Sequence, residues 1–275
     1  MGNQGSNWLQ VGELTTGFGG NELTRSDELA GTQHQLTFAD GSRAHLAFDD
    51  SGELSCTAVA RESEAAALDS RSVATVVTSS RPQIFFVDYL PSGRGRDSVS
   101  LVIDRTTGIG TAVLGRLPTR EETERPLFVR AGAHEELTPV TARLLPFTLS
   151  GDAPSPERRH EATAELVGRR ILYDYGQRDS YEHVYLNERY YTWHCLRGPE
   201  KGLADTDRCY YNKVAPDLHL FVWLEKIVPT LGIVLVDLRA WRSTGKIFGY
   251  RGADFGAVAN AQVGARARLL NVTAY

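Results

Sequence analysis

Cysteine is scarce in this sequence. Its 275 residues include only three, Cys56, Cys195 and Cys209, and they are widely separated. A disulfide framework or a zinc site would need more cysteines at closer, regular spacings. We therefore expect reduced, mostly buried thiols and no bound metal.

The sequence also lacks a basic stripe and a long apolar run. The formal net charge is −4 and charges of both signs are mixed along the chain, so nucleic acid is not an expected partner. No apolar run approaches the roughly 20 residues of a membrane-spanning helix. The first six residues, Met-Gly-Asn-Gln-Gly-Ser, lack the charged and apolar regions of a signal peptide. We expect a cytoplasmic protein without a membrane partner.

Short strand-like runs account for most of the chain. Seven follow one another between Leu29 and Leu114, separated by turns such as Ala39–Gly41, in which glycine supplies the positive dihedral angle of a hairpin. Residues 118–161 are polar, with several prolines and charge clusters, which is typical of a connector. Eight further runs lie between 169 and 272. This pattern predicts antiparallel meanders.

The second series of runs repeats the first. Leu29-Ala-Gly31 opens the first series and Leu166-Val-Gly168 opens the second. Strands that end at Asp104 and Asp237 each lead into a Thr-Gly step. Matches in the same order and at similar spacing indicate two domains of one ancestry.

An antiparallel meander of eight strands loses its exposed edges when it closes into a barrel, and a barrel of that size can hold one small ligand. We therefore predict an all-β protein of two tandem lipocalin-like (calycin-type) antiparallel β-barrels. Only residues 21–29 and 141–145 are candidates for short helices. The predicted boundaries are a lead-in at 1–28, a first barrel domain at 29–117, a connector at 118–161 and a second barrel domain at 162–275.

The second series carries polar aromatic residues where a plain β-core would carry Val, Ile and Leu. Ten of the 11 tyrosines lie after residue 165. Because side chains alternate along a strand, Tyr173 and Tyr175 share one face, and Trp223 and Glu225 share another. Buried hydroxyls and carboxylates need partners, so several such faces predict a ligand pocket inside the second barrel. The alternative is that these faces point to solvent, where Tyr, His and Glu are ordinary.

Two resemblances rest on these residues. Tyr173-x-Tyr175, Tyr181-Glu182 and Trp223-x-Glu225 resemble bacterial phenolic acid decarboxylases over about residues 166–250. Nearly the whole chain resembles the family named molybdenum cofactor biosynthesis protein F (MoaF). The motifs that carry this second resemblance are Tyr191-Thr-Trp-His-Cys-Leu196, Gly202-Leu-Ala-Asp-Thr-Asp207 and Lys246-Ile-Phe-Gly-Tyr250.

The decarboxylase resemblance implies a cofactor-independent lyase that acts on a phenolic or other aromatic carboxylic acid. In that reaction the α-carbon of a para-hydroxycinnamic acid is protonated, and the resulting quinone methide loses carbon dioxide. The resemblance implies that Tyr173 and Tyr175 hold the carboxylate and that Glu225 handles the proton. A Glu beside Trp223 in an apolar barrel would have a raised pKa, so it could deliver a proton near neutral pH.

The candidate site is therefore one for a small aromatic acid, without cofactor or metal. The active-site Arg of the decarboxylases lies between the tyrosines and the Glu, and the nearest residues here are Arg197 and Arg208. If neither reaches the pocket, another reaction or binding alone is expected. The oligomeric state is left open, a homodimer included. The expected catalytic residues are Tyr173, Tyr175 and Glu225, and the expected substrate-binding residues are Tyr181, His183, Tyr185, Trp193, Arg208 and Trp223.

Two other functions are compatible with the sequence. The MoaF resemblance implies a non-catalytic binding or accessory protein linked to molybdenum cofactor metabolism, with a pterin-like ligand as an example. No cysteine-rich or phosphate-cradling motif supports that link. An isomerase or hydrolyase could use the same Tyr and Glu residues on a different substrate.

The remaining polar motifs have plainer interpretations. His183, His194 and His219 would hold a metal only if their strands were neighbours, and we expect separate histidines instead. Asp205 and Asp207 lie in a glycine-containing loop, where aspartates more often form turns than acid–base pairs.

Overall fold

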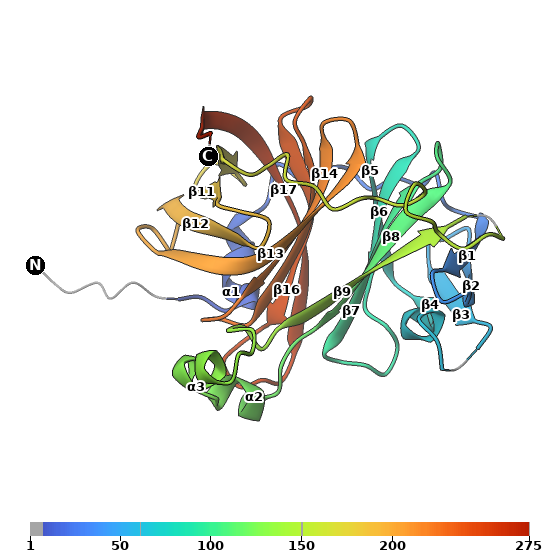
Figure 1. Cartoon of the computed structure of the whole chain (residues 1–275), viewed down its shortest axis with the longest axis horizontal. Coiled ribbons are helices and arrows are strands. Elements are labelled where there is room, and N and C mark those ends of the chain that lie inside the picture. Colours follow the sequence, from blue (N-terminus) through green and yellow to red (C-terminus); the bar gives the residue numbers. More distant parts are fainter. Residues whose placement is uncertain (1–7, 61, 150, 275) are drawn as a thin grey trace, which may run out of the picture. The chain divides into compact units, whose positions relative to one another are not determined.

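The computed structural model describes residues 8–60, 62–149 and 151–274. The chain forms two compact units (Figure 1). Both are built almost entirely from antiparallel strands, which confirms the predicted all-β class. The N-terminal unit consists of residues 23–116 and 142–161, and the C-terminal unit consists of residues 8–22, 117–141 and 162–274.

The N-terminal unit is a nine-stranded antiparallel sheet that forms a nearly closed barrel. Its strands are β1 (Gln33–Phe38), β2 (Arg43–Phe48), β3 (Leu54–Ala58), β4 (Ser70–Val73), β5 (Thr75–Arg81), β6 (Ile84–Tyr89), β7 (Asp97–Asp104), β8 (Ile109–Arg116) and β9 (Thr141–Thr148), with a 3₁₀ turn at Ala65–Leu68. The strand order is β4-β3-β2-β1-β9-β8-β7-β6-β5. Leu36, Phe38, Phe85 and Phe147 are fully buried in its apolar interior.

The C-terminal unit contains a closed barrel of eight antiparallel strands. These are β10 (Arg169–Asp174), β11 (Ser180–Tyr185), β12 (Tyr190–Arg197), β13 (Ala204–Ala215), β14 (Leu218–Glu225), β15 (Thr230–Asp237), β16 (Arg242–Tyr250) and β17 (Val258–Val272). The last strand pairs with the first, where Ala267 lies opposite Tyr173, so the barrel has no open strand edge. Each of the eight runs predicted from the sequence overlaps one of these strands.

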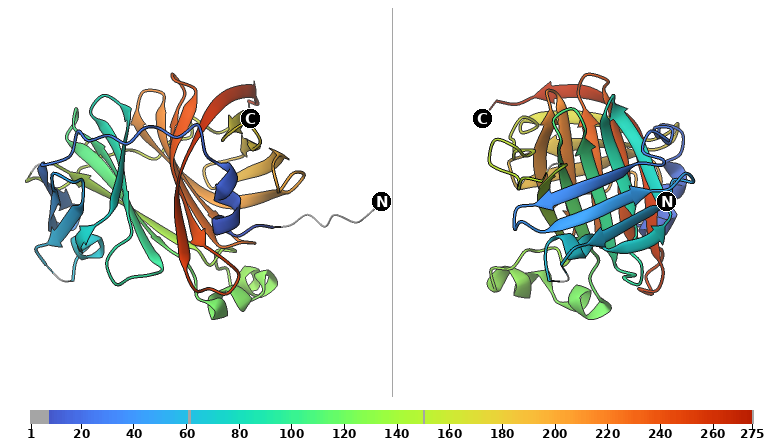
Figure 2. Two further views of the ribbon diagram at one scale, coloured as in Figure 1. Left: turned by 180° about the vertical axis from the view of Figure 1, so that it is seen from behind. Right: turned by 90° about the vertical axis from the view of Figure 1, so that its right-hand side faces the viewer.

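Residues 8–22 pack on the C-terminal barrel, so the predicted lead-in at 1–28 is divided between the two units. This segment, which we call the N-terminal strap, contains α1 (Val11–Leu14) and a 3₁₀ turn at Thr15–Gly17, both beside the barrel in Figure 2. Val11 is completely buried against Gly249, where a Cβ atom would lie 2.3 Å from a Val11 methyl carbon. The strap is therefore part of the barrel's own core.

The predicted connector at 118–161 is also divided. Its second part contributes β9 to the N-terminal sheet, so the predicted short helix at 141–145 is wrong. Phe147 on β9 lies opposite Phe38 on β1, and this tertiary pairing overrides a weak local preference. Residues 21–29 contain no helix either.

Helices are few and short. α2 (Arg120–Glu124) begins with a capping box in which the Glu122 amide donates to the Thr119 hydroxyl at 3.2 Å, and the Glu122 carboxylate accepts from the Thr119 amide at 2.6 Å. α3 (Leu127–Gly132) follows it directly. No helix in the described parts of the chain combines the length and the apolar character needed to cross a membrane.

Candidate functional site

The polar aromatic faces predicted from the sequence point into the C-terminal barrel and not to solvent. Because side chains alternate along each strand, the five neighbouring strands β10 to β14 send rings to the same interior. These rings are buried and contact one another, so they form one cluster. They belong to Tyr173, Tyr175, Tyr181, His183, Tyr185, Tyr191, Trp193, Tyr211, Phe221 and Trp223.

A small cavity remains among these rings. Its volume is about 30 Å³, which is enough for water and far below the roughly 300–1,000 Å³ of a typical ligand site. Leu14 and Phe18 of the N-terminal strap close one side of it. Six of the nine residues predicted for the site line this cavity, namely Tyr175, Tyr181, His183, Trp193, Trp223 and Glu225.

Glu225 is one of two carboxyl groups among the described residues that line this cavity; the other, Glu200, accepts a hydrogen bond from the Tyr181 hydroxyl at 3.0 Å. Glu225 ends β14, is half-buried, and its Oε1 accepts a hydrogen bond from the indole Nε1 of Trp223 at 2.8 Å. Burial raises the pKa of Glu225 well above its ordinary value, and the negative charge of Asp207 raises it further; the Trp223 hydrogen bond opposes both. Burial therefore favours the protonated form of Glu225, which can donate a proton.

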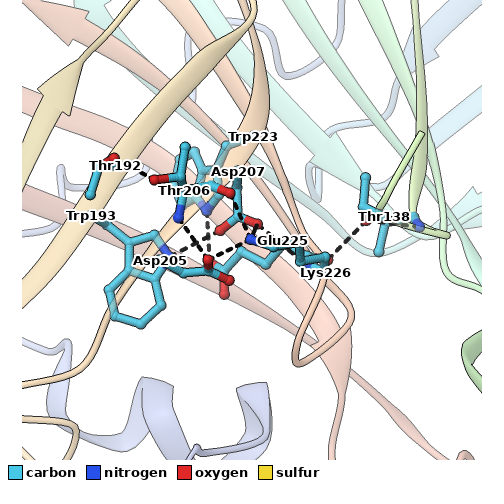
Figure 3. Close-up of polar contacts among 10 residues, drawn as sticks. Thr138, Thr192, Trp193, Asp205, Thr206, Asp207, Trp223, Glu225 and Lys226 are labelled. Atoms are coloured by element: carbon cyan, nitrogen blue, oxygen red, sulfur yellow. Dashed lines mark hydrogen bonds and ion pairs between the residues drawn. The ribbon is translucent and has the colours of Figure 1, made fainter. Parts of the chain in front are cut away.

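Asp207 is a member of the site that the sequence interpretation missed. It lies on β13 with 1% of its surface exposed, and its Oδ2 accepts a hydrogen bond from the Trp193 indole at 3.1 Å. Its other oxygen lies 3.2 Å from the Lys226 ammonium (Figure 3). Strand alternation could have indicated that Asp207 points inward, because Cys209 and Tyr211 follow it at two-residue intervals on the inward face of β13.

The two carboxyl groups have different surroundings. Burial raises the pKa of Asp207 to about 6, and the Lys226 cation opposes that rise. No cation among the described residues pairs with the Glu225 side chain, and its hydrogen-bond partner is the Trp223 indole. These surroundings favour the charged form of Asp207 and the protonated form of Glu225, as in enzymes that divide acid and base roles between two carboxyls.

His183 stands at the centre of the rings. Its ring centroid lies 4.6 Å from that of Tyr173 and 5.2 Å from that of Tyr191. Burial lowers the pKa of His183 to about 3, so the imidazole is neutral. Within the described structure its buried Nδ1 has no hydrogen-bond partner. Such an atom is uncommon in a protein interior and is available to a polar group of a ligand.

The tyrosine pair differs from the arrangement that the decarboxylase resemblance implies. The hydroxyls of Tyr173 and Tyr185 are 2.7 Å apart and bond to each other, and neither residue lines the cavity. Tyr175 lines the cavity itself. Burial raises the pKa of all three phenols, which are uncharged at neutral pH. Tyr173 is thus placed to support Tyr185 and not to hold a carboxylate with Tyr175.

Arg208, predicted as a substrate-binding residue, does not line this cavity. Its neighbours Asp207 and Cys209 face inward, and alternation turns Arg208 outward. There its Nε lies 3.2 Å from Glu136, and its guanidinium lies over the Tyr210 ring at 4.2 Å.

The other candidate, Arg197, does not reach the cavity either. Its guanidinium binds the Asp174 carboxylate at 2.8 Å and the Ser180 hydroxyl at the rim of the barrel. No Arg or Lys belongs to the cavity lining formed by the described residues.

The three histidines considered as metal ligands do not converge. The Nδ1 of His194 contacts Glu182 at 2.9 Å, and the Nε2 of His219 contacts Glu165 at 2.8 Å. His183 is enclosed by rings. Within the part of the chain that the structure describes, no group of three His, Cys, Asp or Glu side chains is arranged to hold a metal ion.

Comparison with known proteins covers nearly the whole chain. Residues 6–119 match the MoaF N-terminal domain, and residues 160–273 match the MoaF C-terminal domain. The chain is 40% identical over 268 residues to Protein MoaF of Klebsiella aerogenes, a match that covers 97% of this chain and 96% of that protein.

A solved structure shows a weaker similarity. The crystal structure of a Burkholderia vietnamiensis protein described as a candidate beta-lactamase matches 38% of this chain and 95% of its own, with 15% identity and a TM-score of 0.33. That similarity is too low to carry an argument, whereas the domain matches and the 40% identity are decisive. The chain belongs to the MoaF family.

Proposed function

We propose that the C-terminal barrel is the active site of a cofactor-independent lyase that acts on a phenolic or other aromatic carboxylic acid. The observation that carries this proposal is Glu225, a carboxyl group with a strongly raised pKa that borders an aromatic-lined cavity. A proton donor needs a pKa near the working pH, and desolvation beside a charged neighbour is a common way to obtain it.

The chemistry is balanced without a metal or a prosthetic group. Glu225 gives its proton to the α-carbon while the phenol loses its own proton to water. The quinone methide then releases carbon dioxide, and the electrons of the broken C–C bond restore the aromatic phenolate. The phenolate and Glu225 regain protons from solvent, so each turnover consumes one proton. An anionic substrate beside Glu225 would keep the acid protonated until transfer.

The cavity supports an aromatic substrate. Tyr175, Trp193 and Trp223 offer ring faces and edges for a second ring to contact. The unpartnered Nδ1 of His183 offers a hydrogen-bonding atom in the same space. We place the activity in the cytoplasm, where the three unpaired and buried cysteines would stay reduced.

The test is turnover of a panel of hydroxycinnamic and related aromatic acids by the purified protein, without added metal or cofactor. Carbon dioxide release and the ultraviolet change of the styrene product are both followed. The Glu225→Gln variant should lose turnover by about 100-fold or more, since general acid catalysis contributes about 10²–10⁴-fold. Glu188→Gln, a change at an exposed position of the same barrel, should retain it.

A second candidate is a non-catalytic protein that binds an aromatic ligand. The observation in its favour is the cavity lining, which offers no Arg or Lys to hold a carboxylate among the described residues. Absence of turnover across the panel, together with tight binding of one member that survives in Glu225→Gln, would reject the lyase and leave the binding protein.

A further inference from the structure

The N-terminal strap places an aromatic ring of its own in the site. Phe18 is 3% exposed and stacks on Tyr175, with ring centroids 4.4 Å apart and planes 16° apart. Its edge faces Tyr181 at 5.7 Å with an angle of 81°. These are the stacked and edge-on contacts that an aromatic ligand would make with the same two tyrosines.

The strap is held by a few contacts near its ends. The amide of Leu9 donates to Glu200 Oε1 at 3.1 Å, and the side-chain amide of Asn21 donates to the Asp174 carbonyl at 2.8 Å. Between them lies α1, a helix of four residues. A helix that short is not stable by itself, so the strap depends on these contacts and on the burial of Val11, Leu14 and Phe18. Segments of this kind open at lower free energy than the strands of a barrel.

The cavity beneath the strap cannot take an aromatic ring while Phe18 is in place. Its volume is about 30 Å³, whereas a cavity that binds benzene has a volume of about 150 Å³. Phe18 lines that cavity, so its departure would add one ring-sized space to it. Glu225 and the unpartnered Nδ1 of His183 lie on the same lining.

We propose that Phe18 occupies the ring-binding position of the site, and that the strap moves away so that a single six-membered aromatic ring takes its place on Tyr175. The polar end of that ligand then reaches His183 and Glu225. The proposal rests on the location of the proposed active site and not on its reaction. The position vacated by Phe18 has the size of one ring, so it selects monocyclic phenols over two-ring ligands such as pterins.

The first measurement is hydrogen exchange, read by mass spectrometry, of residues 8–22 in the full-length protein with and without phenol. Phenol should speed exchange of the Glu13 and Leu14 amides, which bond to the Gln10 carbonyl in the closed strap, while it slows exchange in β10 and β11. 2-Naphthol, which has two fused rings, is the comparison probe and should bind at least about tenfold more weakly, the factor that 1.4 kcal/mol gives.

Two variants test separately the effect of the Phe18 ring and the effect of moving the strap. Phe18→Ala vacates the ring position and should bind phenol about 10- to 100-fold more tightly, because the ligand no longer displaces a buried phenyl group. Gly12→Ala leaves Phe18 intact, yet its Cβ would lie 2.7 Å from the Arg251 carbonyl oxygen and lift the strap. It should also tighten phenol binding, and it gives the answer if Phe18→Ala does not fold.

Phenol binding to the wild type with unchanged or slowed strap exchange would overturn the proposal. Failure of both folded variants to bind phenol more tightly than the wild type would overturn it as well. Turnover of an aromatic acid without faster hydrogen exchange in the strap would reject the strap proposal and leave the lyase proposal standing. Strap release by phenol without turnover of any acid would reject the lyase alone.

Discussion

Asp207 and Glu225 lie on adjacent strands of the C-terminal barrel, one position beyond the paired residues Arg208 and Leu224. Each carboxyl accepts a hydrogen bond from a different tryptophan indole (Figure 3). Only Asp207 also has a cation, Lys226, beside it. The negative charge of Asp207 raises the pKa of Glu225, so a substitution at Asp207 should change the pKa of Glu225.

Replacement of Asp207 by Asn should lower the pKa of Glu225. The substitution removes a negative charge that raises this pKa and leaves the Lys226 cation with Asp205 as its carboxylate partner. Glu225 then loses its proton at lower pH, so the alkaline limb of the kcat/KM profile should move to lower pH. Asp217→Asn, an exposed carboxylate on the same barrel, is the matched control, and an unmoved limb in Asp207→Asn would contradict the coupling.

Replacement of Trp223 by Phe should shift the same limb in the opposite direction. The indole hydrogen bond stabilises the ionised form of Glu225 and lowers its pKa. Without that donor the carboxyl should hold its proton to higher pH. The pH profile and the infrared carbonyl band of the protonated acid both report this change, and Trp241→Phe provides a comparison outside the cavity. A limb that moves to lower pH would show that the indole does not stabilise the carboxylate.

Glu225 should make the C-terminal unit less stable as the pH rises. Its folded-state pKa lies above the value of about 4.5 that it has in the unfolded chain, so the folded state binds more protons between those two pKa values. Stability from this group is complete below pH 4.5 and is lost as the pH rises through the folded pKa. The free energy of unfolding of Glu225→Gln minus that of the wild type should therefore increase from pH 5 upward. All four tryptophans belong to the C-terminal unit, and their fluorescence in urea titrations follows its unfolding.

His183 should make the folded protein less stable as the pH falls below 6.5. Its pKa is about 3 in the folded protein against 6.5 in the unfolded chain, so the unfolded state binds more protons between these values. The wild type should therefore lose up to about 1.4 kcal/mol of stability per pH unit relative to His183→Phe as the pH falls below 6.5. A constant difference between wild type and His183→Phe across this range would mean that His183 is protonated in the fold.

The alternation of strands made much of this site predictable. Tyr175, Tyr181, His183, Trp193, Trp223 and Glu225 line the cavity because residues two apart on a strand share a face. The same rule, applied to Cys209 and Tyr211, would have turned Asp207 inward and Arg208 outward. The sequence analysis instead assigned Asp207 to a glycine-containing loop before the strand, whereas β13 begins at Ala204. The turn interpretation of Asp207 followed from that loop assignment.

Other features leave no local pattern in the sequence. Phe18 enters the cavity through contacts with residues more than 150 positions later in the chain. β9 takes its place between β1 and β8 through pairing with strands far from it in sequence. The periodicity of a segment indicates which of its side chains share a face. It does not indicate which distant segment packs on that face.

The N-terminal strap and the barrel strands that it contacts lie far apart in the sequence. The Leu9 amide and the Glu200 carboxylate that it contacts are separated by 191 residues. During synthesis the strap leaves the ribosome before the barrel strands that receive it. A gene fragment that starts at residue 160, where the C-terminal family domain begins, would encode every strand of that barrel without the ring that fills its mouth. Such a fragment would present Tyr175 and Tyr181 to solvent, so the choice of cloning boundary decides whether the aromatic interior is covered.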